Sequence, residues 1–160
     1  MNEAVQVPIE IGPVKDADPY IERSAKYIER MEKEGYVVVT PGRTEVQVDI
    51  DSKEQYAVFL KQLDALEKRG SVARVIMTIS KSGGRHFRVF LHREINKVER
   101  IAIQAALGSD PLRELLSMFQ YWDGDPIPSL MAERKEAEQY EITYNSDLLS
   151  DFFNFKGVYK

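Results

Sequence analysis

Apolar residues recur along this chain with two different periods, and each period predicts a different kind of element. Spacings of three and four residues predict four helices, whereas alternating or β-branched stretches predict strands. The predicted helices are 18–35, 52–70, 95–107 and 111–122. The predicted strands are 36–40, 44–51, 72–80 and 85–92, with a further short strand near 140–144.

The predicted helices begin at recognisable signals. Asp18 followed by Pro19 is typical of an N-cap with proline at the first helical position. Ser52 and Gln55 have the spacing of a capping box, in which each side chain binds the backbone amide of the other residue. Residues 108–111, Gly-Ser-Asp-Pro, separate the last two predicted helices.

The order of these elements predicts the fold class. Two hairpins are expected, one joining 36–40 to 44–51 and the other joining 72–80 to 85–92. Together with the helices they predict an α+β fold with a single, mostly antiparallel sheet of about four strands from two hairpins, covered by helices. A chain of 160 residues is expected to form one domain, 1–160.

Composition restricts the chemistry that is open to the chain. It contains no cysteine, which excludes disulfides, thiolate zinc sites and cysteine nucleophiles. The N-terminus lacks the basic and then apolar pattern of a signal peptide. No apolar run approaches the roughly 20 residues of a membrane span. We therefore expect a cytoplasmic protein without a membrane partner.

Charge is unevenly distributed, although the net charge is only −4. Residues 81–100 contain six basic and two acidic residues, whereas residues 133–151 contain six acidic and two basic residues. A local basic segment can bind phosphate even in an acidic chain. The alternative is that both stretches are solvated faces without a ligand.

The predicted strand 44–51 carries the first candidate for chemistry. Alternation places Val46, Val48 and Ile50 on one face, and the other face ends with Asp49 and Asp51. Two carboxylates this close repel each other unless a cation lies between them. In a chain without cysteine they suit a hard cation, Mg²⁺ or Mn²⁺. The alternative is an exposed sheet face that ends in two aspartates.

The turn before residue 85 is the second candidate. Gly83 and Gly84 allow backbone amides to approach an anion closely. Beyond Arg85, alternation places His86 and Arg88 on one face, where cationic groups could hold a phosphate chain. The alternative is a plain tight hairpin turn followed by a structural histidine.

A third carboxylate has several candidates. Asp110 precedes Pro111, so it could be a ligand or simply the N-cap of the helix that follows. Asp123 and Asp125 lie in a predicted loop and could equally provide a carboxylate.

The chain presents, in order, an Asp-x-Asp strand, a helix, and a hairpin whose turn reads Ser-Gly-Gly-Arg-His. In this order of motifs it resembles the archaeo-eukaryotic primase superfamily, in particular its short phage- and plasmid-borne members. The resemblance covers about 36–119 and implies an RRM-like core. Asp49 and Asp51 match the first motif of the family, His86 the end of the second, and Asp110 the third. Gly84 stands where the family usually has serine, and the nearest serine is Ser82.

The resemblance implies a metal-dependent nucleotidyltransferase of primase-polymerase type that acts in phage or plasmid DNA replication. Its implied partners are a nucleoside triphosphate, a single-stranded DNA template, and a helicase or other replication protein. Mg²⁺ or Mn²⁺ would be held by Asp49, Asp51 and Asp110. The implied nucleotide-binding residues are Ser82, Gly83, Gly84, Arg85, His86 and Arg88.

Two other functions are compatible with the same residues. A non-catalytic single-stranded nucleic-acid-binding or replication-accessory module would use Arg88, Phe90 and basic neighbours without metal. A purely structural phage or plasmid protein would bind neither triphosphate nor oligonucleotide.

Overall fold

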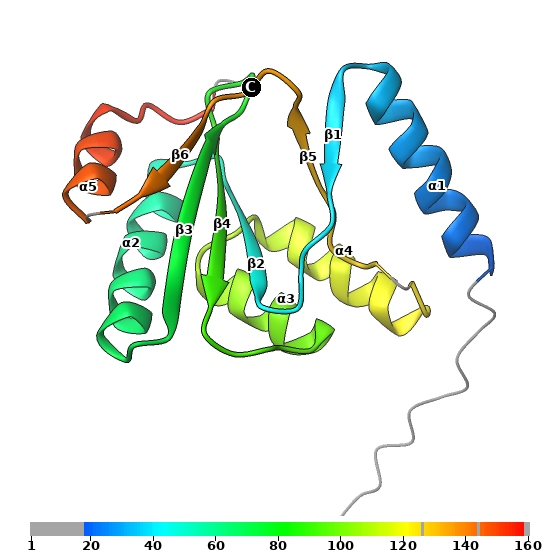
Figure 1. Ribbon diagram of the computed structural model, residues 1–160, viewed down its shortest axis with the longest axis horizontal. Coiled ribbons are helices and arrows are strands. Elements are labelled where there is room, and N and C mark those ends of the chain that lie inside the picture. Colours follow the sequence, from blue (N-terminus) through cyan, green and yellow to red (C-terminus); the bar gives the residue numbers. More distant parts are fainter. Residues whose placement is uncertain (1–17, 126, 144, 159–160) are drawn as a thin grey trace, which may run out of the picture.

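The computed structural model describes residues 18–125, 127–143 and 145–158 and has the α+β class that the sequence predicts (Figure 1). The helices are α1 (Asp18–Lys33), α2 (Lys53–Lys68), α3 (Lys97–Ala106), α4 (Pro111–Trp122) and α5 (Asn145–Asn154). The strands are β1 (Tyr36–Val39), β2 (Glu45–Ile50), β3 (Val72–Ile79), β4 (Arg85–Leu91), β5 (Met131–Arg134) and β6 (Gln139–Ile142). Within these ranges no helix is long and apolar enough to cross a bilayer.

The strands form two antiparallel sheets, so the prediction of a single sheet is wrong. The larger sheet has the order β2-β4-β3-β6, and the smaller one pairs β1 with β5. The predicted hairpin between β3 and β4 is confirmed by their pairing and by a turn in which Ser80 N donates to Gly84 O at 2.9 Å. The predicted hairpin between β1 and β2 does not form, because β1 pairs with β5 from Tyr36↔Arg134 to Val39↔Met131.

The outer edge of β2 is occupied by side chains, which explains why β1 does not pair there. Gln104 Oε1 accepts from Gln47 N at 3.0 Å, and Ser109 Oγ accepts from Asp49 N at 3.2 Å. Arg113 donates to Gln47 O at 3.1 Å. Two further bonds on this edge run from Arg100 Nε to Glu45 O and from Asp110 N to Asp49 O. Strand edges need such partners, and here α3, α4 and their connecting loop supply them.

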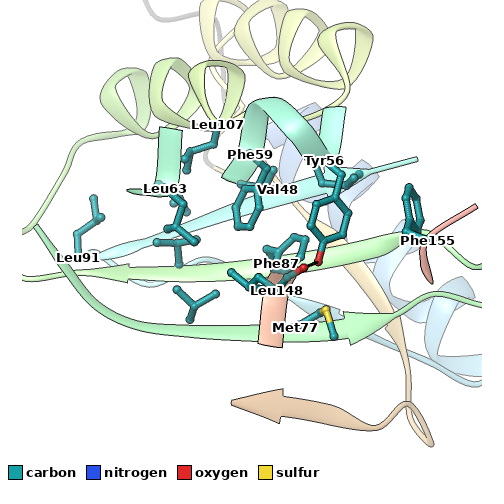
Figure 2. Packing of buried hydrophobic residues seen from close by; sticks show 14 of the residues in the cluster. Val48, Tyr56, Phe59, Leu63, Met77, Phe87, Leu91, Leu107, Leu148 and Phe155 are labelled. Atoms are coloured by element: carbon teal, nitrogen blue, oxygen red, sulfur yellow. Dashed lines mark hydrogen bonds between the residues drawn. The ribbon is translucent and has the colours of Figure 1, made fainter. Parts of the chain in front are cut away.

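One face of the larger sheet packs against α2 and α5 (Figure 2). The inward residues of β2 are fully buried, as their alternation predicts: Val46, Val48 and Ile50. Phe59 of α2 stacks on Phe87 of β4 with ring centroids 4.1 Å apart, and the Tyr56 ring meets Phe87 edge-on. The predicted capping box of Ser52 and Gln55 is present at the start of α2. This core fixes the orientation of β2 and β4, so their other face has a defined geometry.

The C-terminal third differs most from the prediction. The strand expected near 140–144 is present as β6, whereas β5 and α5 were not predicted. On α5, Asp151 accepts a hydrogen bond from the Tyr56 hydroxyl at 2.8 Å, and Leu148 is buried in the core. Figure 1 shows α5 beside α2, and the β1–β5 sheet on the other side of the larger sheet.

Truncation of Gln104 tests the role of side chains at the β2 edge. Gln104 is fully buried and also donates to Glu114 Oε2 at 2.8 Å. Gln104→Ala leaves a buried amide and a buried carboxylate oxygen without partners, so we expect a loss of roughly 2–4 kcal/mol in the free energy of unfolding. Urea denaturation measures it, with Gln62→Ala on the exposed face of α2 as a matched control. A loss no larger than the control's, about 0.5 kcal/mol, contradicts this role.

Candidate functional site

Asp49 and His86 face each other across two adjacent strands. The β2–β4 register pairs Asp49 with His86, and the β3–β4 register pairs His86 with Thr78. The distance from His86 Nε2 to Asp49 Oδ1 is 3.5 Å, and both side chains are largely buried. Asp49 and His86 therefore lie on one face of the larger sheet. The three residues form a polar row across β2, β4 and β3.

Asp49 lies among like charges. Burial raises the pKa of its carboxyl from 3.8 to about 6, and the charges of Asp51, Asp110 and Glu114 add to the increase, while Arg113 opposes it. At neutral pH the carboxylate is thus ionised at a cost in stability. An arrangement of this kind is typical of a site that receives a cation or a proton.

Burial lowers the pKa of His86, and the charge of Glu133, which raises this pKa, does not offset the effect of burial. The imidazole is therefore neutral at physiological pH. Its contact with Asp49 is therefore not an ion pair there. Three buried polar atoms on this side of the sheet have no hydrogen-bond partner among the described residues: His86 Nδ1, Thr78 Oγ1 and Glu133 Oε1. Unsatisfied buried groups in such a row are expected where a polar ligand or ordered water binds.

A cavity of about 450 Å³ adjoins His86, between the β3–β4 turn and β5. Its lining includes Ser80, Lys81 and Ser82 from the turn and Glu133 and Arg134 from β5. The volume lies in the range of small-molecule sites. Hydroxyl groups and the two cationic side chains, Lys81 and Arg134, could bind an anion here, whereas the Glu133 carboxylate opposes it.

The position of the Asp51 carboxylate depends on Gly84, the residue that stands where the primase family usually has serine. A Cβ at Gly84 would lie 2.8 Å from Asp51 Oδ1 and 3.1 Å from Ser80 Oγ. Any side chain at residue 84 would therefore displace the Asp51 carboxylate or the turn. Gly83 has a φ of +94° and makes the turn itself possible. The two glycines thus have separate structural tasks.

Asp110 is the N-cap of α4 and lies beside Asp49. Its Oδ1 accepts from Leu112 N at 2.7 Å and from Arg113 N at 3.1 Å, and its own amide donates to Asp49 O. Asp110 is therefore a helix cap, which was the alternative interpretation, and the charge of its carboxylate also raises the pKa of Asp49. The loop candidates lie elsewhere: Asp123 is the C-cap of α4, and Asp125 accepts from Ile127 N.

Asp49 and Asp51 form a carboxylate pair rather than a complete set of metal ligands. Among the residues that the structure describes, no group of three or more His, Cys, Asp or Glu side chains is arranged to hold a metal ion. Mg²⁺, however, is commonly bound by one or two carboxylates, with water and substrate phosphates as its other ligands. The donors present fit a divalent cation that arrives with a phosphate.

The two arginines proposed for phosphate binding are engaged by carboxylates. Arg85 lies on the opposite face from His86, where it donates to Asp151 twice at 2.9 Å and covers the Phe155 ring. Arg88 donates to Glu45 at 2.7 and 3.1 Å. The cavity cations are instead Lys81 and Arg134. Sequence reasoning did not single out Glu133 and Arg134, since Met-Ala-Glu-Arg has little of the β-branched character that marks a strand.

Comparison with models of protein families, with curated proteins and with solved structures gives no match. The resemblance to primases therefore stays a prediction that rests on the residues themselves. What the site can do is inferred from its geometry.

Neutralisation of Asp49 should stabilise the protein in a pH-dependent way. A folded-state pKa raised to about 6 means that stability present below pH 3.8 is lost as pH rises through 6. Asp49→Asn avoids this loss, so we expect it to increase the free energy of unfolding by roughly 1–3 kcal/mol at pH 8. The gain should shrink between pH 6 and 4.

Urea denaturation from pH 4 to 8 with a chelator present measures this gain. Asp64→Asn, at an exposed position of α2, is the matched control and should change stability little at any pH. A gain for Asp49→Asn that is the same at pH 4 and pH 8 contradicts the strained carboxylate.

Proposed function

We propose that the chain is a metal-dependent nucleotidyltransferase of primase-polymerase type that acts in phage or plasmid DNA replication. The observation that carries the proposal is the pairing of Asp49 with His86 across β2 and β4. Further carboxylates act on Asp49, and a cavity whose lining includes Lys81, Arg134 and Glu133 adjoins His86. A nucleoside triphosphate with a bound divalent cation has the complementary arrangement of charge.

The chain path also supports an RRM-like core. β2, α2, β3 and β4 follow one another, and β4 lies between β2 and β3 in the sheet. This βαββ unit carries Asp49 on its first strand and His86 on its last, the order that the resemblance requires. The small β1–β5 sheet, which the resemblance did not predict, supplies one wall of the cavity.

Each group has a task that follows from its position. Asp49 and Asp51 would hold Mg²⁺ or Mn²⁺, which when bound stabilises charge on the attacking and leaving oxygens. His86 would donate from its ring to a phosphate oxygen, and Lys81 and Arg134 would offset the remaining phosphate charge. Asp110, whose Oδ1 is occupied by backbone amides, would act through its charge on Asp49.

The single-stranded nucleic-acid-binding alternative has less support. It requires Arg88 and Phe90 as a free stacking surface. Arg88 is held by Glu45, and the Phe90 ring is approached by the guanidinium groups of Arg74 at 4.5 Å and Arg88 at 5.3 Å. These contacts already use the groups that an oligonucleotide would need.

Isothermal titration calorimetry with nucleoside triphosphate tests the metal dependence. We expect binding only with Mg²⁺ or Mn²⁺ present, and Asp49→Asn should abolish that metal-dependent binding because it removes one carboxylate ligand. Asp64→Asn is the control and should bind as the unmodified chain does. Unchanged triphosphate affinity of Asp49→Asn with Mg²⁺ present counts decisively against the proposed site. Template-directed primer extension then tests the reaction itself.

The role of His86 is tested by comparing two nucleotides. A charge-assisted contact contributes about 1.5–3 kcal/mol, so His86→Ala should weaken triphosphate binding roughly ten- to a hundred-fold. Monophosphate binding should fall much less, because the outer phosphates are absent. His92→Ala, at the chain's other histidine, is the matched control, because His92 is exposed beyond the end of β4. Equal losses for both nucleotides would defeat the assignment.

A further inference from the structure

Helix α4 is oriented with its polar face inward and its apolar face outward. Glu114 and Ser117 are buried on the inner side, where Glu114 accepts from Gln104, Ser109 and Arg113. Five large apolar side chains on the same helix are exposed: Leu112, Leu115, Leu116, Phe119 and Trp122. Leu112 is 63% exposed and Trp122 is 67% exposed. An exposed apolar surface of this kind marks an interaction site.

The spacing of these side chains indicates another helix as the partner. Leu112, Leu115, Phe119 and Trp122 follow the three- and four-residue steps of a heptad seam, and Leu116 adjoins it. None of the five carries a charge. A helix that lies on an anionic membrane or on nucleic acid presents basic residues beside its apolar stripe. An uncharged seam is typical instead of helix pairing within a protein assembly.

We propose that α4 is the interface of a homodimer, in which α4 of a second copy packs antiparallel against it. The five side chains of two copies would bury on the order of 1,000 Å², close to the lower limit for a specific interface. A two-fold axis near residue 117 places Leu112 against Trp122 and Leu115 against Phe119. Each large ring then meets a leucine, whereas a parallel pair would oppose Trp122 to Trp122. The absence of charge on the stripe leaves no like-charge repulsion across the axis.

This inference does not depend on the proposed catalytic function. Residues 1–17, which lie outside the described ranges, are the other candidate to cover the stripe within one chain. An antiparallel dimer and such an intramolecular cover differ in mass and in concentration dependence. The full chain therefore serves for the experiment.

Sedimentation velocity and light scattering across micromolar concentrations provide the test. We expect a species of twice the 18.4 kDa chain mass that dissociates on dilution. Trp122 is the only tryptophan, so its fluorescence should shift to shorter wavelength as the dimer forms. Leu115→Glu should make the chain monomeric and abolish the shift. Phe153→Glu, at an exposed aromatic residue of α5, is the matched control and should remain dimeric.

Charge complementation tests the antiparallel arrangement. Leu115→Glu and Phe119→Lys should each be monomeric, and an equimolar mixture should regain dimers because residue 115 of one copy faces residue 119 of the other. Circular dichroism melting checks that each variant folds. A monomeric unmodified chain at all concentrations, or a dimer that survives Leu115→Glu, would overturn the proposal. A mixture that stays monomeric would overturn the antiparallel pairing.

Discussion

Within the described part of the chain, one edge of β2 pairs with no strand and is instead hydrogen-bonded by side chains from α3, α4 and the loop between them. The positions of α4 and of the candidate site depend on these hydrogen bonds. Gln104, Ser109 and Arg113 bind the strand's backbone directly, and all three also donate to the buried carboxylate of Glu114. The network fixes the loop between α3 and α4, whose residue Asp110 donates its amide to Asp49 O. Two members of the network also act on Asp49: the charge of Arg113 lowers the pKa of its carboxyl, and the charge of Glu114 raises it by less. The main causes of the raised pKa are burial and the charge of Asp51, so the network adjoins the strained carboxylate without being the source of its strain.

This network also accounts for the exposed stripe on α4. A helix usually buries its apolar face, but the inward face of α4 must carry groups that can bind a strand edge. Glu114 and Ser117 therefore point inward, and the leucine and aromatic side chains of α4 remain outside. Gly108, with a φ of +87°, lets the chain turn between α3 and α4 while its α-carbon lies against α2, where a Cβ would be 2.9 Å from Gln55 O. The orientation of α4 is consequently set from both sides.

Local patterns predicted what local interactions determine. Alternation placed Val48 inward and Asp49 outward, and the Ser52–Gln55 spacing identified the start of α2. The partner of β1 could not be predicted, because β1 and β5 are four-residue strands that lie far apart in the sequence. The position of Arg85 depends similarly on Asp151 in α5. Long-range polar pairs of this kind leave no periodic signal along the chain.

The candidate site places carboxylates and cations around one neutral ring. Carboxylates lie near Asp49, while the cavity that adjoins His86 is lined by Lys81, Arg134 and the carboxylate of Glu133. Since burial keeps the imidazole neutral at physiological pH, it does not cancel the field of these charges. A ligand that carried only negative charge would be repelled by the carboxylates, and a bare cation would lack ligands beyond Asp49 and Asp51. A phosphate chain that brings its own divalent cation would meet both requirements together, and this is the argument for proposing a metal-bound nucleotide rather than either component alone.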